Sequence, residues 1–418
     1  MASVTQSTSA DEVGLWSSFR AGVRTSGIPW LFIVPALLVM LVITFYPQAY
    51  QIYLSFFDFR AEHLTNPTSA PFVGLENYQK VLGDGLNVPN YSFFPLLGFN
   101  IMWTIVNVFF HVVLGVLIAL VLNSKGVFGR RFYRTMFVIP WGLPVLITGL
   151  IWNNMWQLNS GGVNLVAKSL NENLGTNLPT NTDWLGSQIP PLDLRPIVPY
   201  AIIIGCGLLA LWLLRDFIRN GIADPKTKQL SLDRIVWRGG FFILSAAAAI
   251  FTLIDLLQGS LSSSILIQSF ERAGAPVLAF YALLITNGWW LGWPFMMVVA
   301  TGALQSIPAD LYEAADVDGA NKWEQFWSIT VPLIRPAMVP AIMLGTIMTF
   351  NLFNVIYFIS NGGPRGQTEL LITQAYKLVQ QEQLYGAASA FSMVVFFILF
   401  IITLINNRLT RATEAYDA

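Results

Sequence analysis

Long apolar runs constrain the fold of this 418-residue chain more than any other feature. A helix that spans the hydrocarbon layer of a bilayer needs about 20 predominantly apolar residues. The sequence has eight candidates, at roughly 30–55, 96–122, 135–157, 196–215, 239–258, 277–305, 336–358 and 384–406. Helices satisfy their own backbone hydrogen bonds in lipid, so these runs predict an all-α polytopic membrane protein with about eight spanning helices.

Composition supports this class of protein and argues against others. Charged residues make up 11% of the chain, against about 25% in soluble domains. The net charge is zero, which argues against nucleic acid as a partner. Cys206 is the only cysteine and the chain has two histidines, so intrachain disulfides are impossible and a metal site is disfavoured.

The positions of Lys and Arg orient the runs, because cytoplasmic loops carry an excess of these residues. With the N-terminus in the cytoplasm, sixteen of the 23 Lys and Arg fall in cytoplasmic segments, and the opposite orientation reverses that ratio. Both termini are therefore expected in the cytoplasm, together with the polar segment 306–335 between the sixth and seventh runs. Prolines inside the runs mark expected kinks: Pro35, Pro47, Pro140, Pro144, Pro294 and Pro340.

The segment 306–335 is polar and contains turn residues, so it has to stand at the membrane surface. Pro308 suits the first turn of a helix. Gly319 suits the end of that helix, because glycine readily adopts the left-handed conformation that closes one. Asn321 and Glu324 resemble a capping box. The sequence therefore predicts a short helix, a turn and a second short helix before the seventh span.

The order of residues in this segment resembles the EAA loop of ABC importer permeases. It consists of Glu313-Ala314-Ala315, three residues, Gly319, nine residues and Ile329-Thr330-Val331-Pro332, where the family has Leu in place of Val331. The resemblance implies that the loop is a coupling helix that docks in a cleft of a cytoplasmic ATPase subunit. The residues that it assigns to this coupling are Glu313, Ala314, Ala315, Asp318, Gly319 and Pro332.

The resemblance extends over most of the chain and points to sugar importers of the maltose type. Phe72-Val73-Gly74-Leu75-Glu76-Asn77-Tyr78 and Asn361-Gly362-Gly363-Pro364 are similar to external signatures of those permeases. The implied fold is the type I ABC importer (MetI-like) transmembrane domain. Its expected parts are an N-terminal tail 1–27, a first core span 28–60, an external segment 61–95, core spans two and three 96–186, an inserted hairpin 187–272, a permease core 273–407 with the coupling loop 306–335, and a C-terminal tail 408–418.

The inserted hairpin, about 187–272, has no counterpart in the usual six-span core of the family. One interpretation is a peripheral pair of spans that faces lipid. The other is that the six basic residues between Arg215 and Arg238 hold anionic lipid headgroups or an acidic face of a partner subunit.

Substrate sites of transporters lie near mid-membrane on broken or kinked helices. Three strips there, 141–145, 287–295 and 345–354, combine aromatic and hydrogen-bonding side chains. The resemblance places sugar contacts at Trp141, Val145, Leu291, Gly292, Phe295, Met348 and Thr349. Asn287 and Asn351 are added because amides inside a span need partners, although helix–helix hydrogen bonds satisfy them equally well. His111 is expected to be packed and hydrogen-bonded, and not a ligand.

No stretch matches Gly-x-x-x-x-Gly-Lys-Ser/Thr, so the chain is expected to bind no nucleotide and to catalyse no reaction. The resemblance implies the permease subunit of an ATP-driven, binding-protein-dependent importer in a bacterial or archaeal cytoplasmic membrane, with ATP and Mg²⁺ on partner subunits. Expected partners are a second, similar permease, two ATPase subunits, an external sugar-binding protein, membrane lipid and a sugar such as maltose, maltodextrin or trehalose. A glycerol-phosphate cargo and an ion-coupled secondary transporter remain alternatives. The second is disfavoured because the core spans carry almost no ionisable residues.

Overall fold

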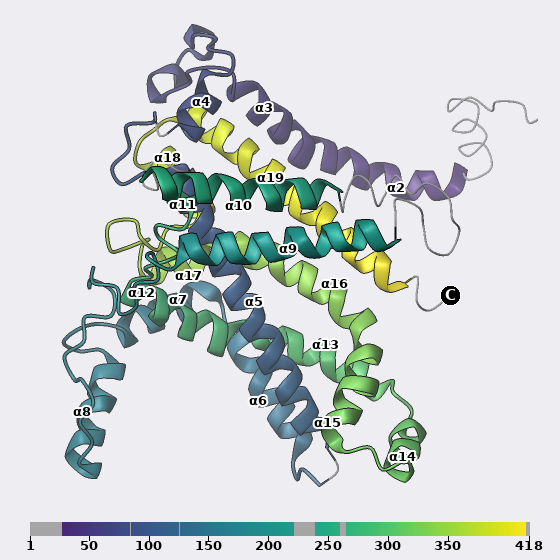
Figure 1. The fold of residues 1–418 in the computed structure, drawn as a ribbon. Coiled ribbons are helices and arrows are strands. Elements are labelled where there is room, and N and C mark those ends of the chain that lie inside the picture. Colours follow the sequence, from purple (N-terminus) through teal and green to yellow (C-terminus); the bar gives the residue numbers. More distant parts are fainter. Residues whose placement is uncertain (1–26, 84, 125, 221–238, 260–264, 415–418) are drawn as a thin grey trace, which may run out of the picture.

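The structure, a computed structural model, describes residues 27–414 except residues 84, 125, 221–238 and 260–264. Residues 1–26 of the expected N-terminal tail and most of the basic loop between Arg215 and Arg238 therefore lie outside the described residues. The helices in chain order are α2 Gly27–Met40, η1 Leu41–Phe45, α3 Tyr46–Leu54, η2 Ala61–Leu64, η3 Pro67–Ser69, α4 Glu76–Leu82, α5 Phe93–Asn123, α6 Arg130–Gly142, α7 Val145–Met155, α8 Gly162–Leu174, α9 Val198–Asn220, α10 Gly240–Gln258, α11 Ile265–Ser269, α12 Leu278–Leu284, η6 Ile285–Leu291, α13 Trp293–Gln305, α14 Ala309–Val317, α15 Lys322–Gln325, η7 Phe326–Thr330, α16 Val331–Phe350, α17 Phe353–Ile359, α18 Leu371–Gln380 and α19 Tyr385–Glu414 (Figure 1).

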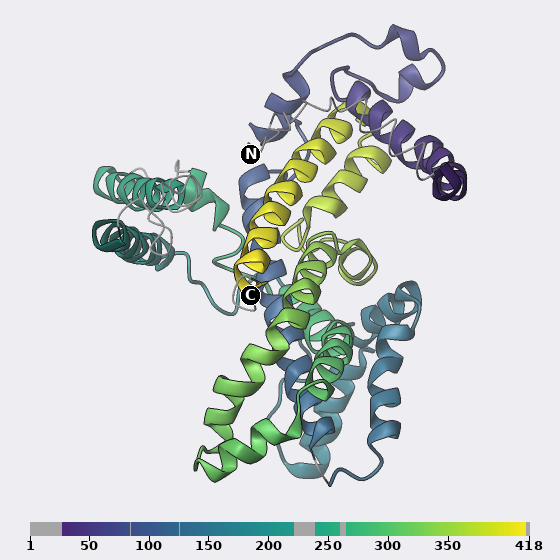
Figure 2. The same cartoon turned by 90° about the vertical axis from the view of Figure 1, so that its right-hand side faces the viewer.

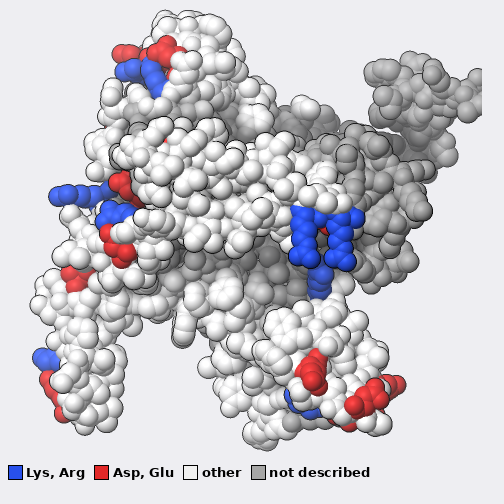
Figure 3. Space-filling view, viewed as in Figure 1, with Lys and Arg blue, Asp and Glu red and all other residues white. Residues whose placement is uncertain are grey.

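The prediction of an all-α protein with about eight spans is confirmed. In the described part, seven helices are long and apolar enough to cross a membrane, and the bent pair α6–α7 makes an eighth if it is counted as one span. Charged side chains gather near the ends of helices and in the connecting segments, and the helical surface between them is uncharged on the face seen in Figure 3. This distribution is typical of helices that lie in lipid, where a charge at mid-membrane is costly.

Helix α5 is the central element, and it packs along α13 and α16. Its close approach to α13 depends on Gly115, where a Cβ atom would come within 2.6 Å of the Met296 side chain and 2.8 Å of the Met297 backbone nitrogen. Small residues allow helix backbones to approach in membranes, where dispersion contacts drive association. Ala119, Met296 and Ala300 are buried beside this crossing.

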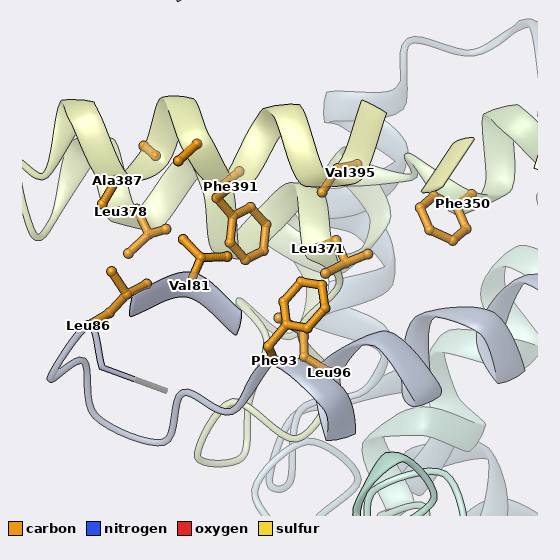
Figure 4. Packing of buried hydrophobic residues seen from close by; sticks show 13 residues of the cluster. Val81, Leu86, Phe93, Leu96, Phe350, Leu371, Leu378, Ala387, Phe391 and Val395 are labelled. Carbon is orange, nitrogen blue, oxygen red and sulfur yellow. The ribbon is translucent and has the colours of Figure 1, made fainter. Parts of the chain in front are cut away.

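A second cluster of buried hydrophobic residues joins the N-terminal end of α5 to the C-terminal helices. Phe93 and Leu96 of α5 pack with Leu371 and Leu378 of α18 and with Phe391 of α19 (Figure 4). All five side chains are buried, and the rings of Phe93 and Phe391 meet edge to face with centroids 6.1 Å apart. The cluster fixes α18 and α19 against the start of α5.

The third predicted span, 135–157, is not one straight helix. Helices α6 and α7 meet at 89° around Leu143 and Pro144. Leu143 has extended backbone angles, φ −76° and ψ 143°, because the ring of a following proline disfavours the helical region. The kink expected at Pro144 is therefore a break that turns the chain sharply.

The seventh predicted span, 336–358, begins earlier in the structure than the sequence predicted. Helices α15, η7 and α16 continue without a break from Lys322 to Phe350, and α17 follows after an interruption at Asn351 and Leu352, so that one apolar stretch covers Lys322–Ile359. The expected second short helix is thus the first turn of the long stretch and not a separate element. The π-helical turn Phe326–Thr330 stands just before Pro332, and such a wider turn accommodates a residue that lacks an N–H and would clash with the carbonyl four positions earlier.

The inserted hairpin stands apart from the bundle. Helices α9 and α10 pack chiefly on each other, and Figure 2 shows the pair at the left, set off from the other helices and joined to them by connecting segments. The two ends of the insertion meet, because the Leu194 backbone N–H donates to the Gly274 carbonyl at 2.7 Å. This arrangement supports the interpretation of a peripheral, lipid-facing hairpin.

Excision of the hairpin tests that interpretation. We expect replacement of residues 198–264 by a short Gly-Ser linker to leave the transport activity that the resemblance implies within about twofold of the wild type, because the chain enters and leaves the insertion at one place. A matched Arg215→Ala/Arg219→Ala variant keeps both helices. It removes two of the basic residues of the hairpin, both on the described helix α9. Loss of subunit assembly in either variant would favour the lipid- or partner-binding interpretation.

Candidate transport cavity and coupling loop

A cavity of about 190 Å³ lies where three helix interruptions meet. These interruptions are the break between α6 and α7, the π-helical turn η6 before Gly292, and the end of α16 at Phe350. Eight of the nine residues predicted to contact substrate line the cavity: Trp141, Val145, Asn287, Leu291, Gly292, Phe295, Met348 and Thr349. The ninth, Asn351, does not line it; it caps the C-terminus of α16, and its amide donates back to the Ile347 carbonyl.

Aromatic and apolar side chains dominate the cavity wall. The rings of Trp141 and Phe295 lie 6.1 Å apart between centroids, and Trp141 and Met348 are 51% and 57% exposed, so the cavity is open on their side. Thr349 is buried, and no hydrogen bond within the described part of the chain engages its hydroxyl group. This wall offers ring faces for stacking and a hydroxyl for hydrogen bonding.

A buried polar network joins α5 to η6 beside the cavity. Asn287 Nδ2 donates to Asn107 Oδ1 at 2.9 Å, and His111 Nε2 donates to the Asn287 carbonyl at 3.1 Å. The imidazole packs so closely on Gly292 that a Cβ atom there would lie 1.9 Å from His111 Nε2. The prediction that His111 is packed and hydrogen-bonded is confirmed, and the Asn287 amide takes part in helix–helix packing.

Several cavity residues were not among the predicted contacts: His111, Pro140, Leu143, Thr148, Met296, Gly345, Leu352 and Val355. Thr148 and Val355 face the cavity only because α7 turns sharply and packs on α17. The prolines at 140 and 144 were the available signal for that turn. In the described residues, no group of three or more His, Cys, Asp or Glu is placed to hold a metal ion.

The coupling loop predicted at 306–335 centres on the short helix α14. Five of the predicted coupling residues lie on α14 or directly after it, and Glu313, Ala314, Asp318 and Gly319 among them are exposed. Pro332 lies apart from α14, in the first turn of α16. The helix ends in a Schellman motif, because the Gly319 N–H donates to Asp316 O and the Ala320 N–H to Ala315 O, with Gly319 at φ +79°.

Polar contacts tie α14 to the long stretch Lys322–Ile359. Lys322 Nζ donates to Asp316 Oδ1 at 2.7 Å, and hydrogen bonds from Lys322 and Gln325 hold the pKa of Asp316 below its usual value. The predicted capping box is present: the Asn321 side chain accepts from the Trp323 and Glu324 N–H groups, and Glu324 accepts from the Asn321 N–H at 2.8 Å. These hydrogen bonds connect α14 directly to the start of α15.

An open groove of about 790 Å³ separates α14 from the ends of α5 and α13. Leu117 and Leu120 of α5 and Leu304 of α13 form its apolar wall, and Glu313 and Lys322 line its other side. Helix α14 thus projects from the helical bundle, and the described residues leave its exposed face uncovered.

Residues 111–414 match the family described as binding-protein-dependent transport system inner membrane components. This chain belongs to that family. It is accordingly a multi-pass membrane protein, and the match spans the cavity and the coupling loop together.

Individual relatives share about a quarter of their aligned residues with this chain. A maltodextrin transport system permease protein of Streptococcus pneumoniae is 24% identical over 95% of this chain and 72% of its own length. A trehalose/maltose transport system permease protein of Thermococcus litoralis is 26% identical over 93% of this chain and 95% of its own. A chain of a solved bacterial ABC transporter that imports the acidic polysaccharide alginate superposes with a TM-score of 0.57 at 16% identity, covering 94% of this chain and 99% of that one. At this identity the structural likeness concerns the fold alone.

Proposed function

We propose that this chain is the transmembrane permease subunit of an ATP-driven, binding-protein-dependent importer of di- or oligosaccharides. The observation that carries the proposal is the pairing of a mid-membrane cavity, at three helix interruptions, with a projecting coupling helix joined to one of the cavity helices. The names of the Streptococcus pneumoniae maltodextrin permease and the Thermococcus litoralis trehalose/maltose permease, to which this chain is similar, support a saccharide as cargo.

The cavity wall favours an uncharged saccharide over the alternatives. It has ring faces at Trp141 and Phe295 and a hydroxyl at Thr349, and none of the described residues that line it is Lys, Arg, Asp or Glu. A glycerol-phosphate cargo would lack a cationic partner there, and an ion-coupled transporter would lack the buried ionisable residues that such proteins carry. Maltose, maltodextrin or trehalose is therefore the preferred cargo.

A second permease subunit is part of the proposal. Ligand pockets for small molecules have volumes of about 300–1,000 Å³, and this chain alone encloses about 190 Å³. The first span, Phe32–Leu54, has no buried residue in its apolar window. A similar permease that covers this helix and faces Trp141 and Met348 would complete both the membrane domain and the sugar site.

Energy would come from two ATPase subunits that hold ATP and Mg²⁺ and grip α14 in the cytoplasm. Their closure would displace α14 and, through Asp316 and Lys322, the long helical stretch that reaches the cavity at Gly345 and Thr349. About 27 residues separate Lys322 from Thr349, a span of about 40 Å in a helix. Alternating access follows if ATP and sugar each bind one global state better than the other. Both termini would then lie in the cytoplasm of a bacterial or archaeal cell.

One reconstitution tests this function. The chain is co-purified with its second permease and ATPase subunits, and ATP hydrolysis is measured with and without the external binding protein, across a panel of sugars. We expect the loaded binding protein to stimulate hydrolysis and the panel to identify a di- or oligosaccharide. Uptake without any ATPase subunit would contradict the proposal.

A further inference from the structure

A polar cavity of about 450 Å³ lies at the opposite end of α5 from the coupling loop. Ser92 and Pro95, at the start of α5, line this cavity, whereas Leu117 and Leu120 near its end line the groove beside α14. Helix α5 has 31 residues and is thus about 46 Å long, as thick as a bilayer with its headgroups. If the coupling loop is cytoplasmic, as the proposed function requires, this cavity opens to the outside.

Three arginines from three separate segments converge on the cavity. Arg195 precedes α9, Arg272 follows α11, and Arg365 lies between α17 and α18. The inserted hairpin therefore supplies two of the three through its ends, which meet at the core. Glu271 is the acidic residue that lines the cavity, so its lining side chains carry a net positive charge.

Two of these arginines hold the walls in place. Arg272 donates to the Gly366 carbonyl at 2.9 Å and to the Asn90 carbonyl at 2.7 Å, which ties the insertion to two external loops. Arg195 forms a two-point pair with Asp193, with Nη2 at 2.7 Å from Oδ2 and Nε at 2.9 Å from Oδ1. Arg365 differs: it is exposed, and no hydrogen bond or ion pair within the described residues engages its guanidinium group.

The chemistry of the cavity fits a carboxylate. A guanidinium group binds carboxylates through two parallel hydrogen bonds, and a prearranged cationic wall strengthens that selection. The cavity suits a saccharide less well than the one beside Trp141 and Phe295, because Tyr91 is the one aromatic residue among the described residues that line it, and its hydroxyl already donates to the Val81 carbonyl at 2.6 Å. The sugar cavity beside His111 lies 19 residues further along α5 than Ser92, about 28 Å away.

We propose that this external arginine cavity, built by Arg195, Arg272 and Arg365, receives an acidic segment of the external binding protein when that protein docks with its cargo. The proposal rests on the proposed function, since it needs an importer that is served by such a protein. The proposal also assigns a function to the two ends of the inserted hairpin, which carry Arg195 and Arg272. The two lipid-facing helices α9 and α10 are not needed for that function.

The test titrates the loaded cognate binding protein against the complete reconstituted transporter and measures the concentration that gives half-maximal stimulation of ATP hydrolysis. We expect Arg365→Glu to raise that concentration about 10-fold at low ionic strength, and Arg365→Lys to raise it less than about threefold, since Lys keeps the charge. The difference should shrink as salt is added, because exposed charges are screened. The maximal rate should be unchanged.

The control is Lys168→Glu, which reverses an exposed charge on α8 that does not line the cavity. Equal half-maximal concentrations for Arg365→Glu and the wild type would overturn the proposal, as would an equal rise in Lys168→Glu. Binding of a free acidic oligosaccharide to the wild type and not to Arg365→Glu would assign the cavity to cargo instead. A wild-type transporter that the binding protein does not stimulate at all would overturn the proposed function itself.

Discussion

Gly319→Pro is expected to reduce sugar uptake by about 100-fold while the protein still inserts into the membrane. Gly319 has φ +79°, and its N–H donates to Asp316 O at the end of the coupling helix. Proline is fixed near φ −65° and has no N–H, so it costs about 3 kcal/mol or more at such a position. That cost is equivalent to a factor of about 100 in an equilibrium. The turn that orients α14 toward the proposed ATPase subunit would be lost.

The measurement pairs sugar uptake with ATP hydrolysis in the reconstituted assembly. If α14 is the coupling element, uptake and stimulation by the binding protein fall together, while the proposed sugar cavity, about 40 Å away along the helix, keeps its ability to bind cargo. Gly319→Asn is the matched control, because Asn tolerates the left-handed conformation, and it should retain uptake within about threefold. Normal uptake in Gly319→Pro would exclude this turn from coupling.

Glu313→Lys probes the same helix without changing its backbone. Glu313 is exposed on α14 and lines the groove beside α5, so reversal of its charge changes the surface that a partner meets and leaves the Schellman motif intact. We expect hydrolysis to be uncoupled from transport, with binding of the external protein less affected. Agreement between Glu313→Lys and Gly319→Pro would show that the orientation and the surface of α14 serve one function.

Local sequence patterns predicted the membrane spans and the helix ends of this molecule, because both features depend on residues close together in the sequence. A span must be apolar over about 20 residues wherever it packs, and a helix terminus uses its own neighbours for capping, as Asn321 and Glu324 do. The ends of helices in the coupling loop were therefore predictable. Their continuation was not: α15 joins α16 through a π-helical turn, which depends on how Pro332 is accommodated within the long stretch.

Packing between distant segments was harder to predict. The prolines at 140 and 144 indicated a kink, but the 89° turn between α6 and α7 depends on the packing of α7 on α17. Asn351 differs from the other predicted contacts: its amide needed a partner inside the span, as expected, and it donates to the Ile347 carbonyl one turn earlier and does not line the cavity. The sequence alone does not distinguish an amide side chain that is hydrogen-bonded to the helix backbone from one that faces a cavity.

Gly292→Ala is the second change with a large expected effect, because it tests how tightly the cavity is packed on α5. The new Cβ atom would lie 1.9 Å from His111 Nε2 and 2.2 Å from its Cε1, so the imidazole must move and its hydrogen bond to the Asn287 carbonyl must break. Overpacking of this kind costs about 1–3 kcal/mol, and we expect uptake to fall about 10-fold or more and the protein to unfold at a lower temperature in detergent.

The double variant Gly292→Ala/His111→Ala decides whether the collision is the cause. Removal of the imidazole makes room for the methyl group, so we expect uptake and thermal stability to recover most of the loss, which is the non-additivity of two residues in contact. Gly302→Ala is the matched control in the same span, since a Cβ atom there would meet nothing within 4 Å. Additive losses in the double variant would mean that Gly292 serves the transport cycle through its own backbone. Recovery would identify the α5–η6 contact as the wall that gives the cavity its shape.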